Sequence, residues 1–261
     1  MGPLAMEDVF DYTVAPILGR RAVLGMVVLQ SDETLEHDLR RILPQEDVAL
    51  YISRVPSAET VSSDSLAAME GHLSDAAALM PPPLDFDVLG YGCTSATSVI
   101  GAGRVAELLR KGCPATHVTD PLSALVAACR HMGITRLAFL SPYVPEVSSR
   151  LRAAVAAQGV ESPVFGTFNE AREHAVALID GPSVTRAATA LLQRGGAEAV
   201  FLSCTNLRTL DVIDAIEAET GAVALSSNQV MAWHMCHLAG IAPALRVGRL
   251  MAEPLFDRSA E

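Results

Sequence analysis

Two of the five cysteines in this sequence stand in the same short pattern, each after an apolar run and before a threonine and a further polar residue. The first pattern is Cys93-Thr94-Ser95 and the second is Cys204-Thr205-Asn206. A cysteine placed where a strand ends and a helix begins lies near the positive end of the helix dipole, which lowers the pKa of the thiol. The two patterns therefore predict two reactive thiols, Cys93 and Cys204.

The polar residues that follow both cysteines are suited to bind a substrate. Hydroxyl and amide groups at the start of a helix either cap the helix or donate hydrogen bonds to a carboxylate oxygen. The residues of this kind are Thr94, Ser95, Thr205 and Asn206. Two matched turns of this composition predict a small carboxylate substrate that is held between two thiols.

The other cysteines and the histidines give no comparable signal. Cys113, Cys129 and Cys236 are dispersed, and a free cysteine usually packs as a small hydrophobic residue. His234 and His237 flank Cys236, but no second cluster completes a tetrahedral metal site. We therefore predict free thiols in a reducing compartment and no metal ion.

Short apolar runs alternate with longer amphipathic stretches, which is typical of parallel βαβ units. The predicted strands are residues 22–29, 48–55, 86–91, 136–140, 199–203 and 222–225. The predicted helices are residues 64–80, 98–111, 122–132, 145–158, 184–194 and 210–220. The strands are almost uninterrupted apolar runs, as expected of parallel strands that are covered on both faces. The sequence therefore predicts an α/β fold.

Each cysteine pattern lies at the carboxyl end of a predicted strand, where open α/β sheets bind ligands. Helices are expected to begin just after the patterns, near Ala96 and near Leu207. The repeat predicts two similar lobes, each with a parallel sheet flanked by helices, and an active site in the crevice between them. Because Asp120-Pro121 is a turn signal, we expect residues 1–120 with 221–261 to form the first lobe and residues 121–220 to form the second.

Composition excludes several classes of protein. The net charge of -11 argues against a nucleic-acid-binding surface, because phosphate binding needs clustered lysine and arginine. No apolar run approaches the roughly 18 residues that a membrane-spanning helix requires. The first twenty residues contain acids and do not follow the basic-then-apolar pattern of a signal peptide. We therefore expect a cytoplasmic protein that binds neither nucleic acid nor membrane.

Five segments in one order extend over most of the chain: residues 29–36, 92–95, 140–143, 203–206 and 226–229, the last followed by Trp233. In these segments the sequence resembles the aspartate/glutamate racemase superfamily. It is most similar to the branch of maleate cis-trans isomerases, arylmalonate decarboxylases and the EutA-type proteins of ectoine utilisation. The paired Cys-Thr turns are the specific part of this resemblance.

The resemblance implies a cofactor-independent enzyme, with the active site between two similar lobes. It implies that Cys93 is the nucleophile or base, that Cys204 is the partner acid, and that Tyr143 hydrogen-bonds a substrate carboxylate. Arylmalonate decarboxylases have one of the two cysteines, so the presence of both here favours isomerisation or racemisation over decarboxylation. The resemblance and the frequency of symmetric oligomers together favour a homodimer.

One residue departs from the pattern of the maleate isomerases, which have asparagine where this chain has Asp32. An ionised aspartate repels a substrate carboxylate, whereas it pairs well with an ammonium or amide N–H group. Asp32 is also placed to cap the helix that follows it, and the two roles are compatible. A second asparagine of the maleate site corresponds either to Asn169 or to His174.

The sequence thus predicts a cofactor-independent isomerase or racemase that acts on a small carboxylate, with or without an amine or amide. The alternative is a non-catalytic protein that binds or senses a small acid in the same crevice, and Asp32 keeps this alternative open. A cysteine hydrolase is a weaker alternative, because no Cys-His-Asn or Cys-His-Asp set is apparent.

Overall fold

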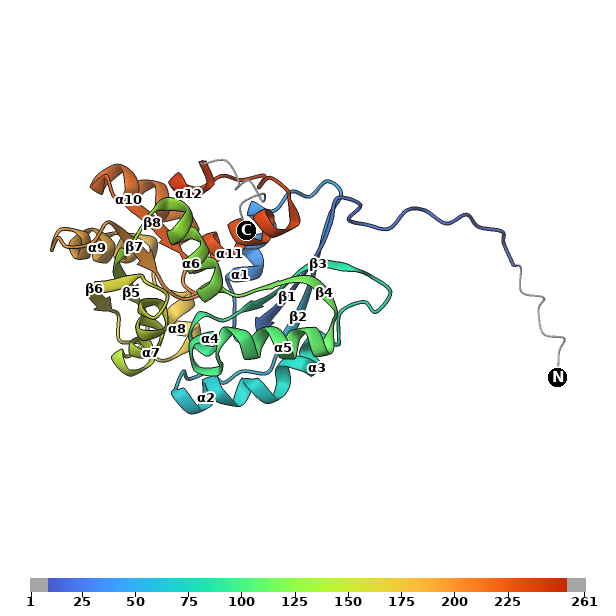
Figure 1. Ribbon diagram of the computed structural model, residues 1–261, viewed down its shortest axis with the longest axis horizontal. Coiled ribbons are helices and arrows are strands. Elements are labelled where there is room, and N and C mark those ends of the chain that lie inside the picture. Colours follow the sequence, from blue (N-terminus) through green and yellow to red (C-terminus); the bar gives the residue numbers. More distant parts are fainter. Residues whose placement is uncertain (1–8, 253–261) are drawn as a thin grey trace.

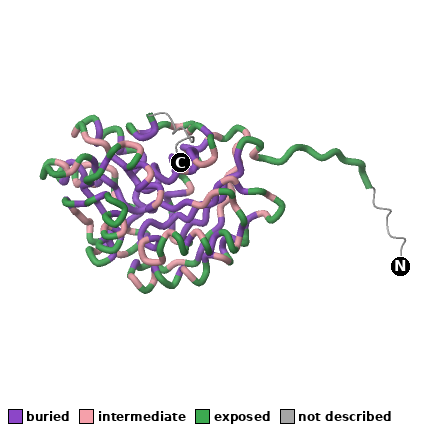
Figure 2. Tube along the Cα trace, in the orientation of Figure 1, coloured by how far each residue is buried: buried purple, intermediate pink, exposed green. Residues whose placement is uncertain are grey.

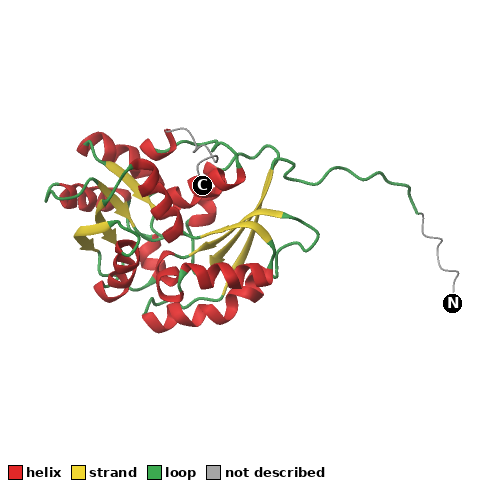
Figure 3. Ribbon diagram, viewed as in Figure 1, coloured by secondary structure: helices red, strands yellow, loops and turns green. Residues whose placement is uncertain are grey.

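The computed structural model describes residues 9–252 and shows two α/β lobes side by side (Figure 1). The strands of the first sheet are β1 (Ala22–Leu29), β2 (Val48–Val55), β3 (Phe86–Gly92) and β4 (Ala115–Thr119). Those of the second are β5 (Arg136–Ser141), β6 (Glu161–Thr167), β7 (Ala199–Leu202) and β8 (Val223–Ser226). Helices enclose both sheets, as the red and yellow ribbons of Figure 3 show. The predicted α/β class and the two similar lobes are confirmed.

The helices follow the strands along the chain. The first half contains α1 (Leu35–Ile42), α2 (Ser63–Ala68), the 3-10 helix η1 (Met69–His72), α3 (Leu73–Ala77), α4 (Thr94–Ile100), α5 (Ala102–Gly112) and α6 (Pro121–Met132). The second half contains α7 (Pro145–Ala156), α8 (Glu173–Ala177), α9 (Gly181–Leu192), the 3-10 helix η2 (Leu210–Val212), α10 (Ile213–Thr220), α11 (Ser227–Ala239) and α12 (Gly248–Ala252).

Both sheets are parallel and have the same topology. The strand order is β2-β1-β3-β4 in the first sheet and β6-β5-β7-β8 in the second. The central strands are mostly apolar and buried, and in β1 all eight residues are buried. The exceptions are Asp87 in β3 and the exposed Arg136 at the start of β5. Figure 2 shows this buried core running through both lobes. The carboxyl ends of the central strands β1, β3, β5 and β7 are therefore fixed on rigid supports.

The prediction lacks the edge strands β4 and β6, whereas the six predicted strands agree with the structure to within one residue at each end. The sequence of β4 is Ala-Thr-His-Val-Thr, and β6 begins Glu-Ser-Pro. Both strands lie at a sheet edge and expose part of their length. Their polar residues interrupt the apolar run that identifies a fully covered strand.

The predicted helices also differ in three places, the first being residues 64–80, which are divided among α2, η1 and α3. The stretch 98–111 is divided between α4 and α5 at Gly101, whose φ of 94° is incompatible with a continuous helix. No helix begins near Leu207, because the chain makes turns after Cys204 and becomes helical only at η2. The first cysteine turn thus leads into a helix and the second does not.

The end of the chain crosses from one lobe to the other. The strand β8 pairs with β7 in the second sheet, so the expectation that this strand returns to the first lobe is wrong. The following helix α11 contacts β3 and β4 of the first sheet and packs along α6. A short apolar strand has the same pattern in either sheet, so the sequence could not distinguish its partner.

None of the helices in residues 9–252 is long and apolar enough to cross a membrane. At the other end of the described chain, residues 9–18 leave the first lobe as an extended arm (Figure 1).

Candidate functional site

The two cysteine turns lie together, and one hydroxyl joins them. Ser227, the first residue of α11, accepts a hydrogen bond from the hydroxyl of Thr94 at 3.0 Å and from the backbone N–H of Cys204 at 3.0 Å. The hydroxyl of Thr205 donates to the carbonyl of Gly92 at 3.2 Å. Gly92, before Cys93, is therefore bonded directly to the second turn, and Thr94, after Cys93, is linked to it through Ser227.

Cys93 lies between β3 and α4 and is the N-cap residue of that helix. Its Sγ accepts a hydrogen bond from the backbone N–H of Ala96 at 3.3 Å. The strand before it approaches its neighbours closely, because a Cβ on Gly92 would collide with Leu35 and one on Gly90 would lie 2.5 Å from Met231. The glycines thus allow the helices to pack tightly against the end of β3.

Cys204 follows β7 in a strained backbone conformation, with φ of 111°. A residue with a side chain in such a sparsely populated region costs about 1–3 kcal/mol and is retained where the surrounding structure enforces it. Here the hydrogen bond to Ser227 holds the backbone N–H, and the N–H of Asn206 donates to the Cys204 Sγ at 3.3 Å. The turn orients the sulfur without a helix behind it.

Tyr143 connects Cys204 to a buried carboxylate. The tyrosine hydroxyl donates to Oε1 of Glu173 at 2.8 Å and lies 2.9 Å from the Sγ of Cys204. A phenol has one proton to donate. With that proton directed to Glu173, the thiol of Cys204 is the donor toward Tyr143. The predicted role of Tyr143 as a donor to the substrate therefore competes with its bond to Glu173.

The expectation that both cysteines have a depressed pKa is wrong. Burial raises the pKa of the Cys93 thiol to about 12, despite the N–H group of Ala96, which lowers it. Burial also raises the pKa of Cys204 well above its usual value, and the negative charge of Glu173 adds to the effect. The N–H groups at these turns do not replace the water that the buried thiols have lost.

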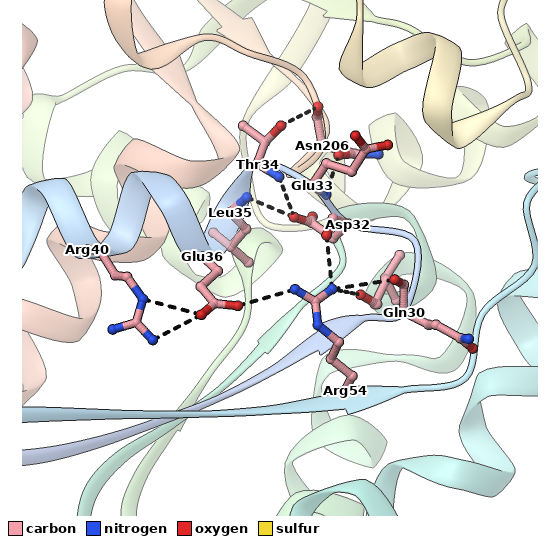
Figure 4. Close-up of polar contacts among 10 residues, drawn as sticks. Gln30, Asp32, Glu33, Thr34, Leu35, Glu36, Arg40, Arg54 and Asn206 are labelled. Carbon is pink, nitrogen blue, oxygen red and sulfur yellow. Dashed lines mark hydrogen bonds and ion pairs between the residues drawn. The ribbon is translucent and has the colours of Figure 1, made fainter.

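Asp32 is buried in the loop between β1 and α1, and only one of its oxygens is used (Figure 4). Its Oδ1 accepts the backbone N–H groups of Thr34 and Leu35 at 2.9 and 2.8 Å, as predicted for a helix cap. Its Oδ2 is buried and has no hydrogen-bond partner among the described residues. An unsatisfied buried acceptor costs about 1–3 kcal/mol, so this oxygen is a place to expect a ligand. Burial raises the pKa of Asp32.

Glu173, at the start of α8, is the main residue that the sequence analysis missed. It is only 3% exposed. Its Oε2 accepts a hydrogen bond from Nδ2 of Asn206 at 3.0 Å, while Oε1 is bonded to Tyr143. Burial raises its pKa, and the charge of Asp32 raises it further. Nothing in the local sequence distinguishes this glutamate from a surface residue.

Asn206 joins the two acidic groups. Its Oδ1 accepts the backbone N–H of Glu33, next to Asp32, at 2.8 Å (Figure 4). Its Nδ2 donates to Glu173. Its carbonyl accepts the hydroxyl of Thr34 at 3.0 Å. All hydrogen-bonding groups of this side chain are thereby engaged within the protein, so Asn206 positions the acids.

The remaining predicted residues are distributed unevenly. Ser95 and Thr205 are buried beside the cysteines. Asn169 and His174 are both exposed, and His174 forms an ion pair with Glu33 at 2.7 Å. Neither of them belongs to the buried cluster, which instead receives Glu173 from the same stretch.

Cys113, Cys129 and Cys236 are buried and free, as predicted. Within residues 9–252 no group of three or more histidine, cysteine or acidic side chains is arranged to hold a metal ion. His234 hydrogen-bonds Thr119 at 2.7 Å, and its ring stacks on those of Trp233 and His237. Burial lowers the pKa of His234 to about 4. The histidines of α11 are thus packing residues.

A family model described as arylmalonate decarboxylase matches residues 104–251, which is more than half of the chain. The chain belongs to this family. A maleate isomerase of Nocardia farcinica is 26% identical over 248 residues, covering 88% of this chain and 95% of that protein. The arylmalonate decarboxylase of Bordetella bronchiseptica is 26% identical over 149 residues, covering 57% and 60%.

Solved structures of the family have the same fold. A cysteine-to-serine variant of Nocardia farcinica maleate cis-trans isomerase, with a covalently bound succinylcysteine intermediate, has a TM-score of 0.75 at 26% identity and covers 88% of this chain and 98% of that one. A maleate isomerase of Pseudomonas putida S16 with maleate has a TM-score of 0.79 at 21% identity, covering 88% and 97%. The resemblance to the superfamily is confirmed.

Proposed function

We propose that this member of the family is a cofactor-independent isomerase or racemase that acts on a small carboxylate through Cys93 and Cys204. The observation that carries the proposal is that two cysteine turns, from different lobes, are hydrogen-bonded together. Thr205 of one turn bonds Gly92 of the other, and Ser227 bonds both turns. Two thiols held in this way can serve opposite faces of one substrate carbon. A cysteine that only packs as a small hydrophobic residue would need no such hydrogen-bonded link between the turns.

The surroundings of the two thiols support different roles. Cys93 receives the N–H of Ala96, which favours its thiolate, so we assign it the role of base or nucleophile. Cys204 is buried beside Glu173, and both the burial and the negative charge of Glu173 favour the neutral thiol, so we assign it the role of acid. In racemisation the Cys93 thiolate removes the α-proton, and the Cys204 thiol donates its proton to the other face of the carbanion. Cys93 ends as the thiol and Cys204 as the thiolate.

A substrate with a cis double bond offers a second route within the same proposal. The Cys93 thiolate adds to one alkene carbon, the single bond that results rotates, and elimination restores the double bond and the thiolate. The succinylcysteine in the Nocardia farcinica relative supports covalent chemistry of this kind. The segment of residues 30–34 supports, within this proposal, a role like that of the EutA-type group, with Asp32 as the residue that disfavours maleate.

Substitution of either cysteine tests the proposal. We expect Cys93→Ala and Cys204→Ala each to abolish deuterium exchange from solvent into the α-carbon of amino and N-acyl amino acids, or the conversion of maleate into fumarate. Each loss should exceed about 100-fold, the usual contribution of a positioned acid or base. Cys113→Ala is the matched control, because it removes a buried thiol outside the site. Turnover that persists in either site variant would refute the two-thiol mechanism.

The alternative is a binding or sensor protein that retains the site without turnover. The raised pKa values of both thiols are the observation in its favour. Calorimetric binding of a small acid by the wild-type protein, with no exchange or isomerisation of that acid under the same conditions, would establish this alternative.

A further inference from the structure

Asp32 and Glu173 are two buried acids, and neither forms an ion pair with a cationic side chain of residues 9–252, although the charge of Arg54 lowers the pKa of Asp32. Among the ion pairs formed within residues 9–252, none includes either residue. Arg54 is the cation best placed to offset the charge of Asp32. Its guanidinium instead donates to the backbone carbonyls of Leu29 and Asp32 and to the carboxylate of Glu36 (Figure 4). Both acids are held by neutral hydrogen-bond donors, which leave the charge of a buried carboxylate without an opposite charge beside it, so these two acids require an explanation.

Both carboxylates have acceptor capacity to spare. An ionised carboxylate accepts about four hydrogen bonds. Glu173 accepts one on each oxygen, from Tyr143 and Asn206, and Asp32 accepts two on Oδ1 and none on the buried Oδ2. The remaining positions call for a donor. A second substrate carboxylate has no donor and carries the same charge, so it is the wrong complement.

The two acids also belong to one assembly with the thiols. Asn206 bonds Glu173 through Nδ2 and the Asp32 loop through Oδ1. Tyr143 bonds Glu173 and lies against the sulfur of Cys204. A group recognised by Asp32 and Glu173 is therefore attached at, or next to, the carbon on which the thiols would act.

We propose that Asp32 and Glu173 form the part of the site that recognises an N–H-bearing group of the substrate, either an ammonium or an amide nitrogen. The substrate is then an amino acid or an N-substituted amino acid instead of a dicarboxylate. This inference rests on the proposed function only in assigning the neighbouring carbon to the thiols. It names Glu173 as a second specificity-determining residue beside Asp32.

The surroundings of Glu173 leave room for a substituent on the nitrogen. An open pocket of about 550 Å³ adjoins this residue and is lined also by Ser31, Glu59, Thr60 and Arg172. An ammonium would satisfy both acids by charge, whereas an amide N–H would satisfy one oxygen and direct its acyl group toward this pocket. A bound cation would in addition offset the negative charge that disfavours the Cys93 thiolate.

The test compares acids that differ only in nitrogen. Binding of succinate, maleate, L- and D-aspartate and N-acetyl-aspartate is measured by calorimetry on the full chain. We expect at least one nitrogen-bearing acid to bind about tenfold more tightly than succinate or maleate, as a charge-assisted hydrogen bond allows. Preference for aspartate identifies an ammonium site, and preference for N-acetyl-aspartate identifies an amide site.

Charge-removing variants locate the preference. Asp32→Asn and Glu173→Gln should each reduce the preference over succinate about tenfold, because an amide presents fewer acceptors and no charge. Glu107→Gln is the matched control, since Glu107 is exposed outside the site and its side chain pairs with Arg104. It should leave the preference unchanged. Circular dichroism confirms folding, and the wild-type comparison stands even if a variant does not fold.

Several outcomes would overturn the inference. They are equal or tighter binding of succinate or maleate by the wild type, binding of no nitrogen-bearing acid, and a preference that survives in both variants. The result is separable from the fate of the two-thiol mechanism. A nitrogen preference without α-proton exchange would leave the recognition intact and refute the mechanism, whereas exchange or isomerisation of unsubstituted diacids would do the reverse.

Discussion

At the scale of single residues, the surroundings of Cys93 and Cys204 disfavour a negative charge on either sulfur. Both are buried, and Glu173 and Asp32 raise the pKa of each thiol. Two unit charges of like sign about 4 Å apart repel by about 4 kcal/mol at the effective dielectric constant of a partly solvated site. The free protein therefore holds neutral thiols, and their ionisation depends on what occupies the site.

This dependence predicts the pH profile of alkylation. A thiol with a pKa of about 12 increases its thiolate fraction with pH throughout the range from 7 to 11, so the rate of iodoacetamide labelling of Cys93 should rise without a plateau. Glu173→Gln removes a charge that raises the pKa, so labelling should be faster at every pH. Peptide mass spectrometry assigns the labelled cysteine, and Glu107→Gln again serves as control. A plateau below pH 8.5 would contradict the assignment.

The sequence identified residues whose own type and position carry the signal. Cys93, Cys204, Thr94, Thr205 and Asn206 come directly after apolar runs, and the structure brings them together. Glu173 lacks such a signal, because its burial arises from contacts with Tyr143 and Asn206 in distant segments. Burial also reversed the expected direction of the thiol pKa values, since the sequence shows the helix start and not the loss of water.

At the scale of elements, strands with an apolar run were predictable, including the partly exposed edge strand β2, whereas edge strands with polar sequences were not. The apolar runs of β1 and β7 identify strands without reference to their neighbours. Strands β4 and β6 form because they complete a sheet, and their own sequences are too polar to show it. The break between α4 and α5 could be suspected from Gly101, but a second glycine two residues later gave the same signal.

These two glycines provide a matched pair for stability. Gly101 has φ of 94° and Gly103 lies within α5, and a Cβ would meet nothing within 4 Å at either position. We expect Gly101→Ala to lower the free energy of unfolding by about 1–2 kcal/mol, from backbone strain alone. Gly103→Ala should raise it by about 0.5–1 kcal/mol, because alanine is the better helix former. Urea denaturation measures both, and equal effects of the two changes would exclude this explanation.

At the scale of the whole molecule, the extended arm of residues 9–18 exposes apolar side chains that one copy of the chain does not cover. Its apolar side chains Val9, Phe10, Tyr12, Val14, Ile17 and Leu18 are all 60% exposed or more, as Figure 2 shows for this segment. Large exposed apolar surfaces mark interaction sites. The homodimer expected from the resemblance remains a proposal, and the arm is the segment best suited to contribute to it.

Deletion of residues 1–18 tests this contribution. Light scattering coupled to size-exclusion chromatography should show a dimer for the full chain and a shift toward monomer for the deletion variant. Substitution of Phe10 and Tyr12 by serine should shift the equilibrium in the same direction while preserving the length of the arm. A monomeric full chain, or a deletion variant that stays dimeric, would rule the arm out as a dimer contact.

The crossing of α11 limits how the protein can admit a substrate. The helix α11 follows β8 of the second sheet and packs on the first sheet. Its first residue, Ser227, is hydrogen-bonded to both cysteine turns. Separation of the two lobes would remove α11 from the first sheet and break the hydrogen bonds of Ser227. The position of α11 therefore couples the two lobes mechanically at the same point where the two sulfur-bearing turns meet.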